Sequence, residues 1–112
     1  MVDKETEKKI SQLQMMEQSM QSFLVQKQQF QAQLIEIESA LKELEKTKEA
    51  YKIVGNIMVS SNKEELENDL KKKKEMVELR IKTLEKQEGQ IKEKAGTVQA
   101  EVMKELKEKK KE

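Results

Sequence analysis

The side chains that most often catalyse reactions or hold metals are missing from this 112-residue sequence. It contains no histidine and no cysteine, so it lacks the usual general base, the usual activated thiol and the commonest zinc ligands. Carboxylates are abundant, but they form no acidic loop with the spacing of a calcium site. Gly55, Gly89 and Gly96 lie too far apart to form a phosphate-binding loop. The sequence therefore predicts a protein that is not an enzyme and needs no cofactor or metal.

Two lysine-rich runs, Lys71 to Lys74 and Lys107 to Lys111, raise the question of nucleic-acid binding. However, 23 basic residues against 22 acidic ones leave a net charge of only +1. Aromatic residues make up 3% of the chain and do not cluster near the lysines, as they would on a surface that stacks bases. We expect these runs to be solvated, ion-paired helix surface, with no nucleic-acid partner.

The sequence has no feature that directs it to a membrane or out of the cell. Its first thirty residues lack the apolar stretch of a signal peptide. No run approaches the roughly 18 apolar residues that a membrane span needs. The absence of cysteine also fits a reducing compartment. A soluble, cytoplasmic protein without a membrane partner is the expectation.

Long helices must position the remaining side chains, because the chain is 40% charged, is rich in helix-forming residues and has no proline. The exception is the segment 50–60, which is rich in β-branched residues and contains the Gly55-Asn56 pair of a two-residue hairpin turn. The following residues fit a capping box, in which the Ser61 hydroxyl caps the Glu64 amide. We predict one domain made of a first arm over 1–49 (with its helix from Lys4 to Lys48), a hairpin over 50–61, and a second arm over 62–112 that becomes helical near Asn62.

Apolar residues recur in both arms with the alternating spacing of three and four that is typical of a coiled coil. Ten of twelve such positions are apolar in the first arm and eight of twelve in the second. In steps of seven, the four series run from Leu13 to Lys48, from Met16 to Tyr51, from Leu70 to Glu105 and from Glu67 to Val102. We call these positions the seam.

The turn decides which seam residues face each other. If the chain folds back between Gly55 and Asn56, facing residues have numbers that sum to 111, as for Leu34 and Val77. The turn and the seam are independent features, and their agreement predicts a mainly α fold: a long antiparallel two-helix coiled coil with one central β-hairpin. Each arm would be roughly 65–70 Å long. The seam contains a polar notch, in which Glu88 faces Phe23 and Lys27 lies one layer away. Such a notch either fixes the register or weakens the seam.

The predicted hairpin is apolar on both faces and has two unpaired edges. A lone two-stranded hairpin is marginal in water, and its edges invite other strands. It either packs against the base of its own coiled coil or joins the hairpins of other subunits in an oligomeric β-barrel, and we favour assembly. The predicted oligomerisation residues are Tyr51, Ile53, Val54, Gly55, Asn56, Ile57, Met58 and Val59.

Two stretches of the sequence resemble the beta-type subunit of archaeal prefoldin. They are Tyr51-Lys52-x-Val54-Gly55-x-x-Met58-Val59 and Leu79-Arg80-Ile81-x-x-Leu84-Glu85-Lys86-Gln87-Glu88. The resemblance covers almost the whole chain, and the single hairpin distinguishes it from the longer alpha-type subunit. It implies a hexamer of two alpha and four beta subunits that holds unfolded proteins at its arm tips without ATP. It also implies delivery to a group II chaperonin, to which the charged tail from Lys104 to Glu112 would dock.

Apolar residues concentrate at the arm ends that carry the two termini, and five of the seven methionines (Met1, Met15, Met16, Met20, Met103) are among them. Methionine is flexible and polarizable, so promiscuous binding surfaces over-use it. The predicted client-binding residues are Ile10, Leu13, Met15, Met16, Met20, Val98, Val102, Met103 and Leu106.

Some of these residues have a simpler explanation, because Met16, Met20 and Val98 lie in the seam and by position belong to its core. Four others lie off the seam and are expected to be exposed for client contact: Ile10, Met15, Met103 and Leu106. The same exposure is expected, on weaker grounds, for Leu24 and Val25. The alternative function is a structural coiled-coil spacer without general client binding. A spacer gives no reason for apolar side chains off the seam.

Overall fold

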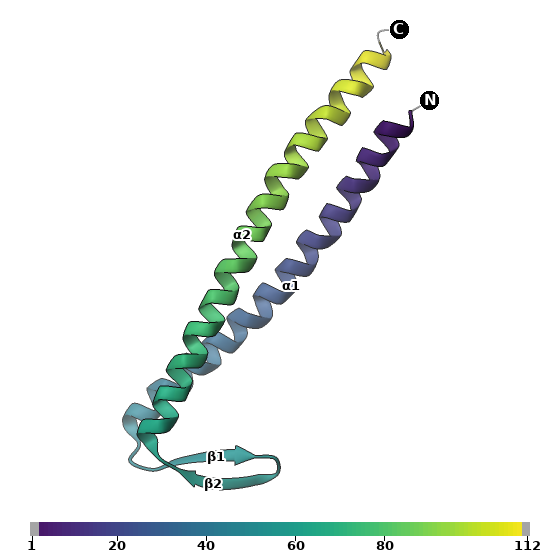
Figure 1. Cartoon of the computed structure of the whole chain (residues 1–112). Helices are drawn as coiled ribbons and strands as arrows, with labels where there is room; N and C mark the ends of the chain where they lie inside the picture. Colours follow the sequence, from purple (N-terminus) through teal and green to yellow (C-terminus); the bar gives the residue numbers. More distant parts are fainter. Residues whose placement is uncertain (1–2, 111–112) are drawn as a thin grey trace. The chain divides into compact units, whose positions relative to one another are not determined.

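The structure is a computed structural model that describes residues 3–110, with side chains described for residues 3–108. Its elements follow in the order α1 (Lys4–Lys46), β1 (Ala50–Val54), β2 (Ile57–Ser61) and α2 (Lys63–Lys110), as Figure 1 shows. The predicted mainly α fold with one central hairpin is confirmed. No helix within the described range is long and apolar enough to cross a membrane.

Side chains that precede the helices cap their first turns. Asp3 accepts the amide of Thr6 at 2.9 Å before α1, and Asn62 accepts the amide of Glu64 at 2.9 Å before α2. The predicted Ser61 cap is therefore wrong. Ser61 is the last residue of β2 and pairs with Ala50, and the adjacent Asn62 is an equally good capping residue.

The hairpin has the predicted register. Val54 pairs with Ile57, and the ladder continues through Ile53 and Met58 to Ala50 and Ser61. Gly55 has a φ of 63°, and no other described residue has a positive φ. A positive φ at the first turn residue alone is the pattern of a type II′ turn, which matches the twist of the two strands. The two-residue turn predicted at Gly55-Asn56 is confirmed.

The chain divides into two compact units, which we name by what they contain. The terminal unit comprises the described residues up to Lys27 and those from Thr83 onward, and the hairpin unit comprises Gln28–Lys82. Each unit contains a segment of α1 that packs antiparallel on a segment of α2. Every predicted seam position is buried or half-buried except Lys48 and Tyr51, which follow the end of α1.

The core of each unit is this seam. In the terminal unit the most buried seam residues are Leu84, Val98 and Val102. In the hairpin unit they are Ile37, Leu44 and Val77, and Ala50 at the start of β1 is buried as well. These are small or medium aliphatic side chains in a layer one residue deep, so burial is confined to the line where the two helices meet.

Candidate functional site

A polar cluster lies at the end of the terminal unit. Thr6 is 1% exposed, and its hydroxyl is 2.8 Å from Asp3 Oδ1 and also within hydrogen-bond distance of Glu105 Oε2. The hydroxyl has one proton, so it donates to one of the two carboxylates at a time. Lys9 Nζ pairs with Glu105 and lies 3.5 Å from Glu101 Oε2. The cluster joins the first turns of α1 to the last turns of α2.

Lys9 and Glu105 stabilise each other's charge. The hydrogen bond from Lys9, followed by that from Thr6, lowers the pKa of Glu105 below its ordinary value. The hydrogen bond to Glu105 in turn raises the pKa of Lys9. Both side chains therefore stay charged at neutral pH, and the seam ends in a polar contact where the apolar residues stop.

Apolar periodicity does not reveal this cluster, because the two seam series of the first arm have their first apolar residues at Leu13 and Met16. One further step of seven leads to Thr6 and Lys9, and the numbers of Thr6 and Glu105 sum to 111. The signal was thus present in the sequence. It is not visible in the apolar pattern because the seam residues at these positions are polar.

The predicted client-binding residues fall into three groups by exposure. Val98 and Val102 are buried in the seam. A second group is half-buried and consists of Ile10, Leu13, Met16, Met20 and Leu106. Met15 and Met103 project into solvent, with 66% and 54% of their surface exposed. Leu24 and Val25 are also exposed.

The exposure expected for Ile10 and Leu106 is therefore only partial. Ile10 directly follows the seam residue Lys9, and Leu106 directly follows Glu105, so each borders the seam and loses part of its surface to it. Met15 and Met103 also adjoin seam residues, Met16 and Val102, but their side chains stay exposed, so sequence adjacency to the seam does not by itself decide burial. The off-seam apolar surface of the terminal unit thus includes Met15 and Met103, the exposed Leu24 and Val25, and partly covered residues beside the seam.

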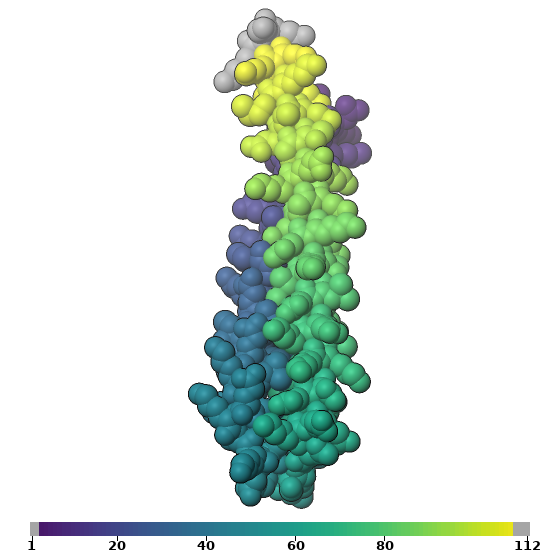
Figure 2. Space-filling model, turned by 90° about the vertical axis from the view of Figure 1, so that its left-hand side faces the viewer, coloured from purple at the N-terminus to yellow at the C-terminus, as the bar shows by residue number. Residues whose placement is uncertain are grey.

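The last turn of α2 extends beyond the start of α1 within the terminal unit, as Figures 1 and 2 show. This follows from the register, because Lys4 stands opposite Lys107 while α2 continues to Lys110. A shallow hollow on α2 alone is lined by Ala100, Met103, Lys104, Lys107 and Glu108. The hollow combines two apolar side chains with two lysines and one glutamate, all of them from α2.

The predicted polar notch is an ion pair across the seam. Lys27 Nζ lies 3.2 Å from Glu88 Oε2, and both side chains are 20% exposed. Glu88 Oε1 is buried and has no hydrogen-bond partner among the described residues. A shift in register would separate the pair and leave two charges inside the seam. The ion pair is thus observed, and whether it fixes the register or weakens the seam stays a prediction.

The hairpin exposes apolar side chains on both faces. Ile53, at 69% exposure, and its cross-strand neighbour Met58, at 66%, lie on one face, and Val54 and Ile57 lie exposed on the other. The Tyr51 hydroxyl donates to Glu49 Oε2 at 2.9 Å. The hairpin thus does not bury its faces against its own helices, which was the alternative to assembly.

The comparisons with known proteins agree with this architecture. A family model described as "Prefoldin subunit" matches residues 7–109. The chain belongs to the prefoldin subunit family. It is 41% identical to the prefoldin subunit beta of Archaeoglobus fulgidus over 93 residues, which cover 80% of each chain. It is 33% identical to the prefoldin subunit beta of Methanothrix thermoacetophila over 105 residues, covering 91% of this chain and 88% of the relative.

A solved structure gives the same result for the fold. The crystal structure of the prefoldin beta subunit from Thermococcus strain KS-1 superposes with a TM-score of 0.85 and is 31% identical in sequence. The match covers 93% of this chain and 94% of the solved one. The resemblance to the beta-type prefoldin subunit is confirmed, and the protein is a subunit of a prefoldin chaperone. Prefoldins are chaperones and are not known as enzymes.

Proposed function

We propose that this chain is an ATP-independent holdase subunit that binds unfolded polypeptides on its terminal unit and passes them to a group II chaperonin. The observation that carries the proposal is the exposed apolar surface off the seam, above all Met15 and Met103. An exposed methionine adapts its shape to different apolar partners, which suits a surface that has no single client. A spacer protein would have no use for these side chains.

The half-buried residues beside the seam extend this surface. Ile10 and Leu106 flank the polar cluster, and Leu13, Met16 and Met20 continue along α1. A client segment that contacts Met15 or Met103 would also reach these partly covered side chains. Val98 and Val102 would support the surface from beneath, because they are buried in the seam.

Assembly through the hairpin is the second part of the proposal. Apolar residues on both faces and two unpaired edges suit a β-barrel built from several subunits. The partner we propose is an alpha-type prefoldin subunit, in a hexamer of two alpha and four beta subunits in the cytoplasm. Several copies would present several terminal units to one client, so that weak apolar contacts add up. The charged tail from Lys104 onward, part of which lies outside the described side chains, would dock to the chaperonin.

The test is aggregation of an unfolded client, measured by light scattering, in the presence of this chain assembled with an alpha-type partner and without ATP. We expect the Met15→Ser/Met103→Ser variant to need several-fold more protein for the same protection. The matched control is Ile35→Ser, which removes an apolar side chain of similar exposure (65%) from the hairpin unit. Protection by the methionine variant equal to that by the control would contradict the site. Failure of the parent assembly to protect unrelated clients would favour the spacer.

A further inference from the structure

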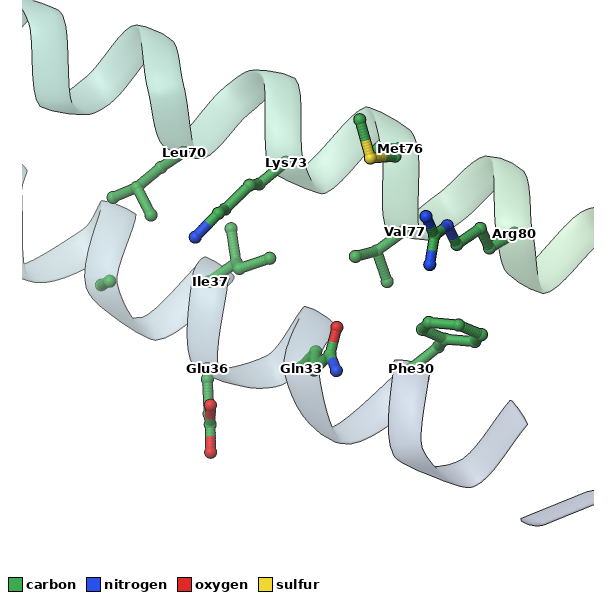
Figure 3. Close-up of a pocket in the computed structure, with 10 residues that line it drawn as sticks. Phe30, Gln33, Glu36, Ile37, Leu70, Lys73, Met76, Val77 and Arg80 are labelled. Carbon is green, nitrogen blue, oxygen red and sulfur yellow. The ribbon is translucent and has the colours of Figure 1, made fainter. Parts of the chain in front are cut away.

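We propose that a groove on the hairpin unit is a docking site for an acidic amphipathic helix of a partner protein, separate from the client surface of the terminal unit. The groove lies between α1 and α2, and Figure 3 shows its side chains. Its floor is apolar and is formed by Phe30, Ile37, Ala40, Leu70 and Val77. Met76, on its α2 border, is 56% exposed. The methyl side chain of Ala40 leaves the hollow between the two helices unfilled.

The α2 border of the groove is cationic. Lys73 and Arg80 line it, and Lys73 has no ion-pair partner among the described residues. The Arg80 guanidinium stands 5.5 Å from the centre of the Phe30 ring. Such cation–π stacking holds the guanidinium in place and leaves its N–H groups free for a carboxylate. In Figure 3 the Glu36 side chain points away from α2, so it does not neutralise either cation.

The groove continues toward the hairpin. A second hollow shares Leu70, Lys73 and Met76 with the first and adds Leu66, Lys72 and Lys52. Lys52 lies on β1, so the combined groove runs from Arg80 to the hairpin. Its lining carries Lys52, Lys72, Lys73 and Arg80 against two acids, Glu36 and Asp69. A ligand with carboxylates beside an apolar stripe would complement both the floor and the charge.

The dimensions of the groove suit a helix of about four turns. Its α2 border from Leu66 to Arg80 is roughly 21 Å long at 1.5 Å per residue. A helix placed there would seat apolar residues at positions i, i+4, i+7 and i+11 on the floor and carry Glu or Asp beside them. A nucleic acid is the less suitable ligand, because Phe30 is the one aromatic ring in the lining and Arg80 already stacks on it, so successive bases find no stacking surface. The proposal therefore commits to a peptide.

The first experiment compares two labelled peptides with the full-length chain assembled with its alpha-type partner. One is a 15-residue helical peptide with leucines at i, i+4, i+7 and i+11 and flanking glutamates, and the other has glutamines in place of the glutamates. Fluorescence anisotropy at low salt is expected to show binding of the glutamate peptide at least about tenfold tighter, with the difference falling as salt is added. Equal affinities would overturn the proposal, as would stronger binding of an oligo-dT that displaces the peptide.

The second experiment locates the site with variants. Lys73→Gln/Arg80→Gln is expected to weaken the glutamate peptide about tenfold or more, and Ala40→Leu to weaken both peptides by filling the floor. The matched controls are Lys82→Gln/Lys86→Gln and Ala32→Leu, which change exposed residues that do not line the groove. Peptide affinities that respond equally to groove variants and controls would overturn the site, provided that circular dichroism shows intact helices. Client protection by Lys73→Gln/Arg80→Gln is expected to equal that of the parent.

Discussion

The terminal unit and the hairpin unit use the same heptad pattern but differ in which groups they leave without a partner. In the terminal unit the seam charges are paired within the chain, as Lys9 with Glu105 and Lys27 with Glu88. In the hairpin unit the strands expose their apolar faces, and Lys73 has no ionic partner among the described residues. The terminal unit pairs its seam charges within one chain and exposes separate methionines, whereas the hairpin unit leaves strand edges, strand faces and cationic side chains for other chains.

The largest expected effect comes from charging the hairpin. Ile53→Asp/Met58→Asp changes two paired, exposed residues on one face. Burying each side chain in an assembly would contribute about 1.5–3 kcal/mol, so their replacement by carboxylates is expected to dissociate the oligomer. Light scattering coupled to size exclusion would report the mass, and circular dichroism the retained helices. Ser60→Asp on the same face is the control. If the mass is unchanged, the exposed hairpin face does not mediate assembly.

The next effect tests the ion pair in the seam of the terminal unit. Lys27→Met is expected to lower the free energy of unfolding by about 1–3 kcal/mol, because it leaves the Glu88 carboxylate in the seam without its cation. The double variant Lys27→Met/Glu88→Leu is expected to be as stable as the parent or more stable. Urea titration followed by circular dichroism measures both. If the single and double variants unfold at the same urea concentration, the pair is not coupled and its role in the register is refuted.

A smaller loss of stability is expected from a change at the start of α2, directly after the hairpin. Asn62→Ala removes the side chain that accepts the Glu64 amide and is expected to cost about 1 kcal/mol. Ser61→Ala, which alters the residue predicted from the capping-box pattern, is expected to change stability by only a few tenths of that amount. The same urea titrations compare them. A larger loss for Ser61→Ala would restore the original capping assignment.

The smallest effect is expected from acid at the polar cluster. The pKa of Glu105 is lowered in the folded state, so its contribution is fully present above the unfolded value of about 4.3 and is lost as the pH falls through the folded pKa. The difference in melting temperature between the parent and Glu105→Gln is therefore expected to shrink from pH 7 to pH 3. Glu85→Gln, an exposed carboxylate outside the cluster, controls for general titration. A difference that is constant with pH would show that the Glu105 charge does not hold the cluster together.

The regular parts of this fold could be predicted from the sequence because each has a local cause. The Gly55-Asn56 pair located the turn, and the steps of seven located nearly every residue that the helices bury. The Ser61 error arose because a capping pattern does not tell how far strand pairing extends. The burial of Ala50 also depends on where the chain leaves α1 and enters β1, which no periodicity encodes.

The candidate sites were less accessible to prediction. Apolar spacing identified Met15 and Met103 as residues off the seam, and both are exposed; their role in client binding stays a prediction. The Thr6, Lys9 and Glu105 contacts were missed, because a search for apolar periodicity passes over polar seam residues. The groove beside Ala40 was missed as well, because a hollow depends on the sizes of neighbours that come from two distant segments.

The two-residue turn at Gly55 has a consequence for how this chain can change in length. Val54 pairs with Ile57 in the hairpin unit, and Thr6 contacts Glu105 in the terminal unit. In both units, therefore, the numbers of facing residues sum to 111. Deleting one heptad from α1 alone would move Thr6 and Lys9 away from their partners by about 10 Å. Insertions and deletions in homologous chains are therefore expected to occur in mirror-related pairs of heptads, one in each helix, at equal distances from the turn.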